Sequence, residues 1–536
     1  DAENIFTCYD WEDAPAPYGK TKTLLAYDQS KEPESWGWPA FSQHARKQGA
    51  VRTEMSALCQ RFKLHLSQEA IDLPTLPDGV SAEKAISDYL RLLGNFAVEK
   101  VKEKTGWGLQ HIQWCLTVPA IWDDAAKAAM KRAAQAAGLV HDPLSGTGIG
   151  SSHDLLIVLE PEAAALYCEK QSQKLGIGLG NSVMVVDCGG GTVDLVTHKQ
   201  SEEDPTRLRE VARGTGGMCG GTFVDDRFVK FLQNKINKSD KFLEENQQLF
   251  VKLMGKWEAA KRSFDGTSDI SIDLPSKLER MWVDQLIEEG KAEEAEEVDG
   301  LELSVKDLKF IFDPVVDQIC LLIQEQREDL KTRGCSSPTS MYLVGGFSES
   351  RYLQKRVRET FADCFEHVYT PPQPGSAIVQ GAVVFGLNPS KFSSRIARRT
   401  YGVDATSTFD ELTHDPTKKK WYTDLNRFQC ESLFTKYIEK GQEIPCGSVI
   451  KHSFKPTSLK QKRVSFTILS TPNKKPKYSD EADVVEEAVL EVPIAGAGLD
   501  REIEVEFQFG ATTFGVTGTD PLTGKKCDLN LQFNRL

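Results

Sequence analysis

Short apolar runs alternate with longer helical patterns along the first 388 residues of the chain. Runs such as Val183–Val186 and Met341–Val344 are too short for helices and predict buried strands. Apolar residues at helical spacing predict helices over 82–104 and 305–332, and a long helical region is expected from about 240 to 263. Strands that alternate with helices are typical of an α/β core.

The pattern changes between about residues 389 and 400, and alternation with a period of two follows. The clearest case is Glu502–Phe509, in which polar and apolar residues alternate strictly. Such a strand has one buried face and one wet face, as in an antiparallel sheet. We therefore expect a linker at 389–400 and a separate all-β, sandwich-like domain at 401–536.

Composition narrows the class of protein. The chain has 536 residues, of which 40% are hydrophobic and 27% charged, as in folded globular proteins. A net charge of −13 argues against nucleic acid or an anionic membrane as the main partner. No apolar run approaches the ~18 residues of a membrane span, and no basic-then-apolar signal segment opens the sequence. Twelve cysteines are scattered singly, which predicts reduced thiols and a cytoplasmic location.

One glycine-rich turn carries the strongest chemical signal, because it directly follows a predicted strand. The run Asp187–Asp194 begins on a carboxylate, passes through three glycines at 189–191, and resumes as a strand. Glycines allow backbone N–H groups to approach a phosphate, and a carboxylate at a strand end can hold Mg²⁺ through water. A tight structural hairpin fits the same residues, and the P-loop sequence occurs nowhere in the chain.

Two further glycine turns and one acid follow apolar strands in the same region. The turns are Gly220-Gly221 and Gly345-Gly346, and the acid is Glu160. Because strand ends of α/β sheets gather at one edge, we expect Glu160 and Asp187 at a common cleft beside phosphate-binding turns. The segment Glu258–Arg262 adds charged side chains on neighbouring helical faces, an arrangement that is also typical of ordinary protein surface.

Taken in order, five segments resemble the ATPase domain of the seventy-kilodalton heat-shock chaperones, in the actin/hexokinase-type superfamily. The likeness is closest to their divergent heat-shock protein 12A/12B-like branch and covers nearly the whole chain. The segments resemble two connecting motifs, a phosphate motif, a branch-specific glycine turn and an adenosine motif: Val118–Ala125, Glu160–Ala165, Asp187–Asp194, Gly214–Phe223 and Leu343–Ser350.

The resemblance implies an ATP/ADP and Mg²⁺ site between the two lobes of an actin/ribonuclease-H-like ATPase domain at 1–388. Lobe I would comprise about 1–180 plus 365–388, and lobe II about 181–364. By the same resemblance, Asp187 would hold Mg²⁺ through water, Glu160 would orient the attacking water, and Thr192 would assist catalysis. The implied phosphate ligands are Gly189, Gly190, Gly191 and Thr192. The residues implied around the adenosine are Gly220, Gly221, Glu258, Lys261, Arg262, Gly345 and Gly346.

Three departures from the family pattern leave ATP hydrolysis open. The opening phosphate hairpin of the family, a strand ending in D-F-G-T-T, is absent from this sequence. The family's catalytic lysine has no clear counterpart, although Arg61 and Lys63 fall at about the right place. The linker segment Ser390–Arg398 lacks the apolar-acidic run that couples the two domains in typical chaperones. We therefore expect a weak or impaired ATPase.

Three functions remain open at this point. The first is an ATP-binding, chaperone-like protein, whose β domain would correspond to the family's peptide-binding sandwich and would take an unfolded peptide or protein client. The second is a non-catalytic, nucleotide-sensing interaction protein. The third is a small-molecule kinase of the same superfamily, which would need a catalytic base at an acceptor cleft that the sequence does not mark.

Overall fold

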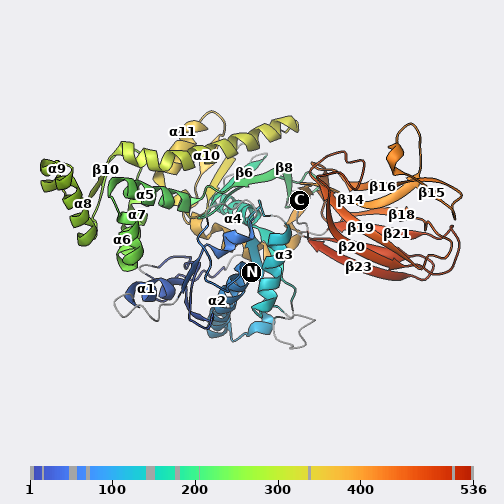
Figure 1. Cartoon of the computed structure of the whole chain (residues 1–536), viewed down its shortest axis with the longest axis horizontal. Coiled ribbons are helices and arrows are strands. Elements are labelled where there is room, and N and C mark those ends of the chain that lie inside the picture. Colours follow the sequence, from blue (N-terminus) through green and yellow to red (C-terminus); the bar gives the residue numbers. More distant parts are fainter. Residues whose placement is uncertain are drawn as a thin grey trace. The chain divides into compact units, whose positions relative to one another are not determined.

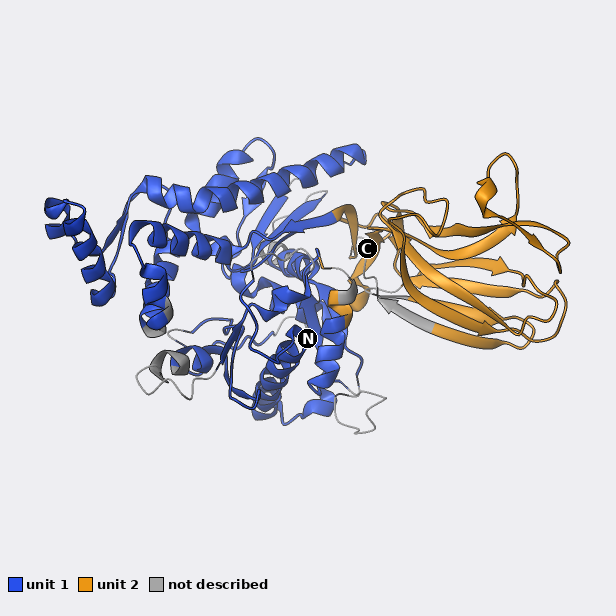
Figure 2. Ribbon diagram, viewed as in Figure 1, with its two compact units in different colours: residues 1–121, 129–197, 214–387 blue, residues 122–128, 198–213, 388–536 orange. Residues whose placement is uncertain are grey.

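The computed structural model has two compact units (Figure 2). Unit 1 comprises 1–121, 129–197 and 214–387, and unit 2 comprises 122–128, 198–213 and 388–536. Helices and several sheets make the protein a mixed α/β fold (Figure 1). The structure describes residues 5–14, 17–47, 57–67, 73–122, 124–140, 151, 153–175, 182–204, 206–335, 338, 340–509 and 513–532.

A small sheet of order β2-β1-β3 lies near the start of unit 1. Its strands and the helices next to them in sequence are β1 (Leu24–Tyr27), β2 (Pro33–Trp36), α1 (Gly37–Lys47), β3 (Ala57–Gln60) and α2 (Ala82–Thr105). The helix expected at 82–104 is confirmed as α2, and Ser81 caps it by accepting a hydrogen bond from Lys84 N at 3.1 Å. The hydroxyl of Tyr27 on β1 donates to Asp88 on α2 at 3.0 Å, which fixes the helix to the sheet.

Two parallel strands, β4 (Cys115–Val118) and β5 (Leu156–Leu159), are each followed by a helix. These helices are α3 (Asp124–Ala136) and α4 (Glu160–Leu175). Because α4 begins directly at the end of β5, Glu160 is its first residue. The helix α4 packs against α12 (Ala377–Leu387).

The sheet that carries most of the glycine turns includes the consecutive strands β12-β11-β6-β7-β8. Their bounds are β6 (Val183–Cys188), β7 (Val193–Gln200), β8 (Leu208–Gly217), β11 (Ser340–Val344) and β12 (His367–Tyr369). Both expected strands, 183–186 and 341–344, are therefore confirmed. The strands β11 and β6 run parallel with Val344 opposite Asp187, so their carboxyl ends meet at one edge of the sheet.

The remaining helices of unit 1 follow β8 in sequence. They are, with a two-stranded sheet between them, α5 (Gly221–Lys235), α6 (Ser239–Glu245), α7 (Gln247–Ser263), β9 (Ile270–Ile272), α8 (Ser276–Glu288), α9 (Ala292–Glu296), β10 (Leu301–Leu303), α10 (Val305–Thr332) and α11 (Arg351–Thr360). The prediction of 305–332 is confirmed by α10, which starts with a capping box of Ser304 and Asp307 and lies beside α5 and α11 (Figure 1).

The long helical region expected from about 240 to 263 is confirmed, and a break at Asn246 divides it into α6 and α7. Asn246 has φ −125° and donates its side-chain amide to the carbonyl oxygen of Phe242 at 2.9 Å. A short amide side chain that bonds to nearby backbone competes with helical hydrogen bonds. Other short turns are 3₁₀ helices: η1 (Phe62–Leu66), η2 (Leu109–His111), η3 (Phe347–Glu349), η4 (Pro374–Ser376), η5 (Pro389–Lys391) and η6 (Pro416–Lys418).

Unit 2 contains two antiparallel sheets. One has the order β15-β16-β14-β19-β20 and the other β18-β21-β22-β23. Their bounds are β14 (Thr400–Thr408), β15 (Lys419–Tyr422), β16 (Arg427–Ile438), β18 (Val449–Phe454), β19 (Arg463–Thr471), β20 (Val485–Pro493), β21 (Ile503–Phe509), β22 (Thr513–Asp520) and β23 (Lys525–Gln532). The strand β21 confirms the prediction from alternation, since every second residue is buried. Within the range expected as a linker, β13 (Phe392–Ile396) pairs antiparallel with β17 (Glu443–Pro445).

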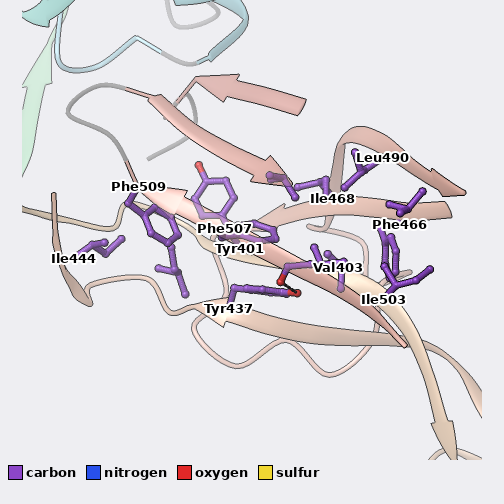
Figure 3. Close-up of a cluster of buried hydrophobic side chains, with 14 of the residues drawn as sticks. Tyr401, Val403, Tyr437, Ile444, Phe466, Ile468, Leu490, Ile503, Phe507 and Phe509 are labelled. Atoms are coloured by element: carbon purple, nitrogen blue, oxygen red, sulfur yellow. Dashed lines mark hydrogen bonds between the residues drawn. The ribbon is translucent and has the colours of Figure 1, made fainter. Parts of the chain in front are cut away.

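The two sheets of unit 2 share one apolar core (Figure 3). Side chains from both meet there, such as Tyr401 on β14, Ile468 on β19 and Phe507 on β21. The ring of Tyr437 on β16 stacks on Phe507 with centroids 4.0 Å apart, and its hydroxyl donates to Val505 O at 3.1 Å. A buried tyrosine with its hydroxyl bonded joins the sheets without leaving a polar group unpaired.

None of the described helices is long and apolar enough to span a bilayer.

Gly381 tests the contact between α12 and α4, the helix that begins at Glu160. A Cβ at Gly381 would overlap the carbonyl oxygen of Ala163, whereas one at Gly386 would lie 3.9 Å from Cys115 Cβ. We expect Gly381→Ala to lower the free energy of unfolding by about 1–3 kcal/mol. Gly386→Ala is the matched control in the same helix, and its gain of up to about 1 kcal/mol reflects helix propensity. Urea unfolding measures both, and equal effects would contradict the close packing.

Candidate functional site

The turn at Gly189–Gly191 is held by the turn at Gly220-Gly221 through backbone hydrogen bonds. The N–H of Gly220 donates to Gly191 O at 3.2 Å, and that of Gly221 donates to Gly189 O at 3.0 Å. Thr222 donates both its N–H and its hydroxyl to Gly190 O at 2.9 Å. A Cβ at Gly220 would overlap the Gly190 carbonyl, so this approach requires glycine. The structure thus brings two of the three predicted glycine turns into direct contact.

The carbonyl groups of the turn at Gly189–Gly191 accept hydrogen bonds, but two amides of this turn donate none to the described residues. Within the described part of the chain, the N–H groups of Gly190 and Gly191 donate no hydrogen bond. Gly190 is also exposed. Unbonded amides in a turn that is fixed through its carbonyls are suited to bind an anion.

The third turn, Gly345-Gly346, lies beside Asp187 because β11 and β6 are paired in parallel. Gly345 has φ +85°, and a Cβ there would overlap Asp187 Oδ1 and the carbonyl of Cys188. On the other side, a Cβ at Gly221 would lie 3.2 Å from Phe347 Cγ in η3. The three turns are therefore neighbours in unit 1.

Three acids lie at these turns, and their environments differ. Asp187, Asp194 and Glu160 are all buried. Glu160 forms an ion pair with Lys63. Asp194 Oδ1 accepts hydrogen bonds from the N–H groups of Ala120 at 2.6 Å and Ile121 at 3.2 Å, which ties β7 to the first connecting motif. Asp123 of that motif lies outside the described residues.

Burial raises the pKa of both aspartates. The pKa of Asp187 is held well above its usual range by desolvation, and then by the negative charges of Glu160 and Asp194. Desolvation raises the pKa of Asp194 from 3.8 to about 7, and the charge of Glu160 adds to the shift. Hydrogen bonds from Thr192 and from the two backbone amides oppose it, so the Thr192 hydroxyl acts on Asp194. Among the described residues, Asp187 Oδ1 and Asp194 Oδ2 are buried without a hydrogen-bond partner.

A directly coordinated Mg²⁺ does not fit these side chains. In the described ranges, no group of three or more His, Cys, Asp or Glu residues could hold a metal ion. The Glu160 carboxylate is already neutralised by Lys63, and Asp187 Oδ1 packs against Gly345. Mg²⁺ held by Asp187 through water remains a prediction from the resemblance.

The three charged residues expected around the adenosine form one chain of ion pairs on α7. Lys261 contacts Glu258 at 2.7 Å, and Arg262 contacts Glu258 at 2.8 Å. Two acids that the sequence did not mark extend this chain: Asp225 on α5 lies 2.7 Å from Lys261, and Glu349 on η3 lies 2.7 Å from Arg262. Since η3 directly follows Gly346, the ion pairs connect α7 to the third glycine turn.

Sequence reasoning missed the segment around residues 18–22. The hydroxyl of Tyr18 donates to Glu349 at 2.7 Å, and the Arg262 guanidinium lies 5.3 Å from the centre of the Tyr18 ring. Lys20 is half-buried, and a Cβ at Gly346 would lie 3.8 Å from its Nζ. The run Tyr18-Gly-Lys-Thr-Lys22 matches no motif and has no apolar periodicity, so only the tertiary fold reveals this placement.

The two candidates for the family's lysine have different partners. Arg61 makes a two-point contact with Asp226 on α5, at 2.9 and 2.8 Å. Lys63 pairs with Glu160, a predicted site residue. Of the two candidates, Lys63 is therefore the one that contacts a predicted site residue.

Asp194 gives a pH-dependent test of the buried acids. Its raised pKa means that the folded state binds more protons than the unfolded state between pH 3.8 and about 7. Its contribution to the free energy of unfolding therefore falls as pH rises through that window. We expect wild type to lose about 2–4 kcal/mol relative to Asp194→Asn between pH 4 and 7.5, measured by urea unfolding. Asparagine keeps the acceptor for Ala120 and Ile121, and a difference that stays constant with pH would contradict the shift.

Comparisons with known proteins show what the chain is similar to. Residues 179–368 match a family model described as "Domain of unknown function (DUF8340)". The chain is 27% identical to mouse Heat shock 70 kDa protein 12A and 26% identical to human Heat shock 70 kDa protein 12B. Each alignment covers 99% of this chain and 88% of the relative. The predicted likeness to the heat shock 70 kDa protein 12A/12B branch is therefore confirmed over nearly the whole chain.

Proposed function

We propose that unit 1 binds ATP or ADP and that the protein is chaperone-like. The observation that carries this proposal is the pair of locked glycine turns, which leaves the Gly190 and Gly191 amides unbonded within the described ranges. These amides supply donors for the β- and γ-phosphates. The Gly345-Gly346 turn and the ion-paired residues of α7 supply the walls for the adenosine. The named relatives support a nucleotide-binding protein of the seventy-kilodalton heat-shock family.

The finer architecture belongs to the same proposal. Unit 1 would have the two-lobed, actin/ribonuclease-H-like arrangement, and the order β12-β11-β6-β7-β8 with parallel β6, β11 and β12 supports it. Unit 2 would bind an unfolded peptide or protein client, and its two sheets around one core are the support for this role. A cytoplasmic location stays a prediction from the cysteine pattern.

The state of Glu160 favours a second candidate, a non-catalytic nucleotide-sensing protein. The resemblance gives Glu160 the task of orienting the attacking water. Its carboxylate is instead engaged in an ion pair with Lys63, which occupies Oε1. Single-turnover ATP hydrolysis separates the two candidates, because a sensing protein would bind the nucleotide and leave it intact.

Gly190→Ala tests nucleotide binding without disturbing the fold. A Cβ at Gly190 would lie 3.8 Å from Thr222 Cγ2, which is ordinary van der Waals contact. The methyl group would nevertheless stand on the exposed turn, where it obstructs a phosphate. We expect the affinity for ATP, measured by calorimetry, to fall by about tenfold or more with an unchanged melting temperature.

Gly255→Ala on α7 is the matched control, since a Cβ there meets nothing within 4 Å. It should leave ATP affinity unchanged. Unchanged affinity in Gly190→Ala would overturn the assignment of this turn to phosphate, and absence of ATP binding by wild type would overturn the proposed function itself.

A further inference from the structure

Lys20 is a charged residue near the glycine turns that belongs to none of the five sequence motifs. Its side chain reaches the Gly345-Gly346 turn, where Nζ lies 3.8 Å from the position of a Cβ on Gly346. Its charged neighbours are Asp187 on β6, Glu160 on α4, Glu349 on η3 and Lys63 on η1. The side chain thus enters the region in which four elements of unit 1 meet.

The acids around Lys20 are mostly neutralised by other cations. Glu160 pairs with Lys63, and Glu349 contacts Arg262 at 2.7 Å. Lys20 itself makes no hydrogen bond or ion pair with any residue that the structure describes. Asp187 has no ion pair within the same part of the chain. Among the described residues, one basic and one acidic side chain are therefore left without an ion pair at the site, and no hydrogen bond or ion pair joins the two.

A desolvated ammonium group without a partner is unfavourable. Taking a charge out of water is costly unless an opposite charge or strong hydrogen bonds replace the water. Burial accordingly lowers the pKa of Lys20, although the charges of Asp187, Glu160 and Glu349 oppose that shift. An anionic oxygen beside Nζ would remove the penalty.

A phosphate group would supply the anionic oxygen beside Nζ, and its other oxygens could accept hydrogen bonds from the neighbouring amides. Lysine binds phosphate as a point charge, and charge-assisted hydrogen bonds are about twice as strong as neutral ones. The unbonded amides of Gly190 and Gly191 belong to a turn next to Gly345-Gly346, so one polyphosphate could contact both. Lys20 would also balance the charge of Asp187, the task that a divalent cation would otherwise perform.

We propose that Lys20 is a phosphate ligand of the nucleotide site and that its ammonium group allows this site to bind nucleotide without a divalent metal. This inference rests on the proposed nucleotide binding. It adds that the nucleotide binds with its polyphosphate free of metal.

The test compares wild type, Lys20→Gln and Lys20→Arg by calorimetry with ATP, in buffer containing EDTA and in buffer containing Mg²⁺. We expect wild type to bind in EDTA within about threefold of its affinity in Mg²⁺. Lys20→Gln should lose about tenfold or more in EDTA, and Lys20→Arg should recover most of the affinity. Lys309→Gln is the matched control, because Lys309 is exposed on α10 and loses the same charge.

Thermal unfolding without nucleotide separates a ligand role from a structural one. Removing an unpartnered, half-buried charge should leave the melting temperature of Lys20→Gln unchanged or raise it. If Lys20→Gln does not fold, Lys20 has a structural role and the proposal is wrong. Equal ATP affinities of Lys20→Gln and wild type in EDTA would also overturn it, as would wild-type binding that requires Mg²⁺.

Failure of the proposed function gives a different result. If wild type binds no ATP in either buffer, the nucleotide assignment is wrong, and the same variants are titrated with inorganic tripolyphosphate. Binding by wild type that Lys20→Gln loses would keep Lys20 as a phosphate ligand. Absence of tripolyphosphate binding would overturn the proposal for Lys20 as well.

Discussion

The backbone contact between the turns at 189–191 and 220–222 is the constraint on which the rest of unit 1 depends. Each carbonyl of the first turn accepts a hydrogen bond from the second, and Gly220 permits this approach because it has no Cβ. The helix α5 starts at Gly221, so its position follows from the contact. Asp225 on α5 then bonds Lys261 on α7, and the ion pairs continue to η3. A contact between two short turns thus fixes the helices that surround the candidate site.

The same contact decides which polar groups remain for a ligand. The carbonyls of the turn at 189–191 already accept hydrogen bonds from the turn at 220–222. Among the described residues, the unbonded backbone groups of the first turn are therefore amides. Such a turn attracts anions and offers little to a cation. The charged side chains follow the same logic, because Glu160 and Glu349 each have a basic partner while Lys20 has none among the described residues. Backbone and side chains therefore both favour a negatively charged ligand.

The sequence predicts elements that rest on local periodicity and fails where tertiary contacts decide. Periodicity identifies α10, and alternation identifies β21, because each presents one face to a core. The break at Asn246 depends on a side chain that competes for a helical carbonyl, which apolar spacing does not report. Likewise, Arg61 and Lys63 are two residues apart and chemically alike in sequence, but the left-handed backbone at Arg61 (φ 54°) begins η1, and the two side chains reach different acids.

Some motif residues have their polar groups bonded within the fold, and others keep polar groups that could contact a ligand. Asp194 belongs to the same octapeptide as Asp187, but one of its oxygens is held by two amides of the first connecting motif. Its role is to join β7 to that motif, which explains its burial without a ligand. A match to the octapeptide therefore indicates architecture first. Evidence for a ligand comes instead from groups that the fold leaves unsatisfied, and Lys20, which no motif contains, is one of these.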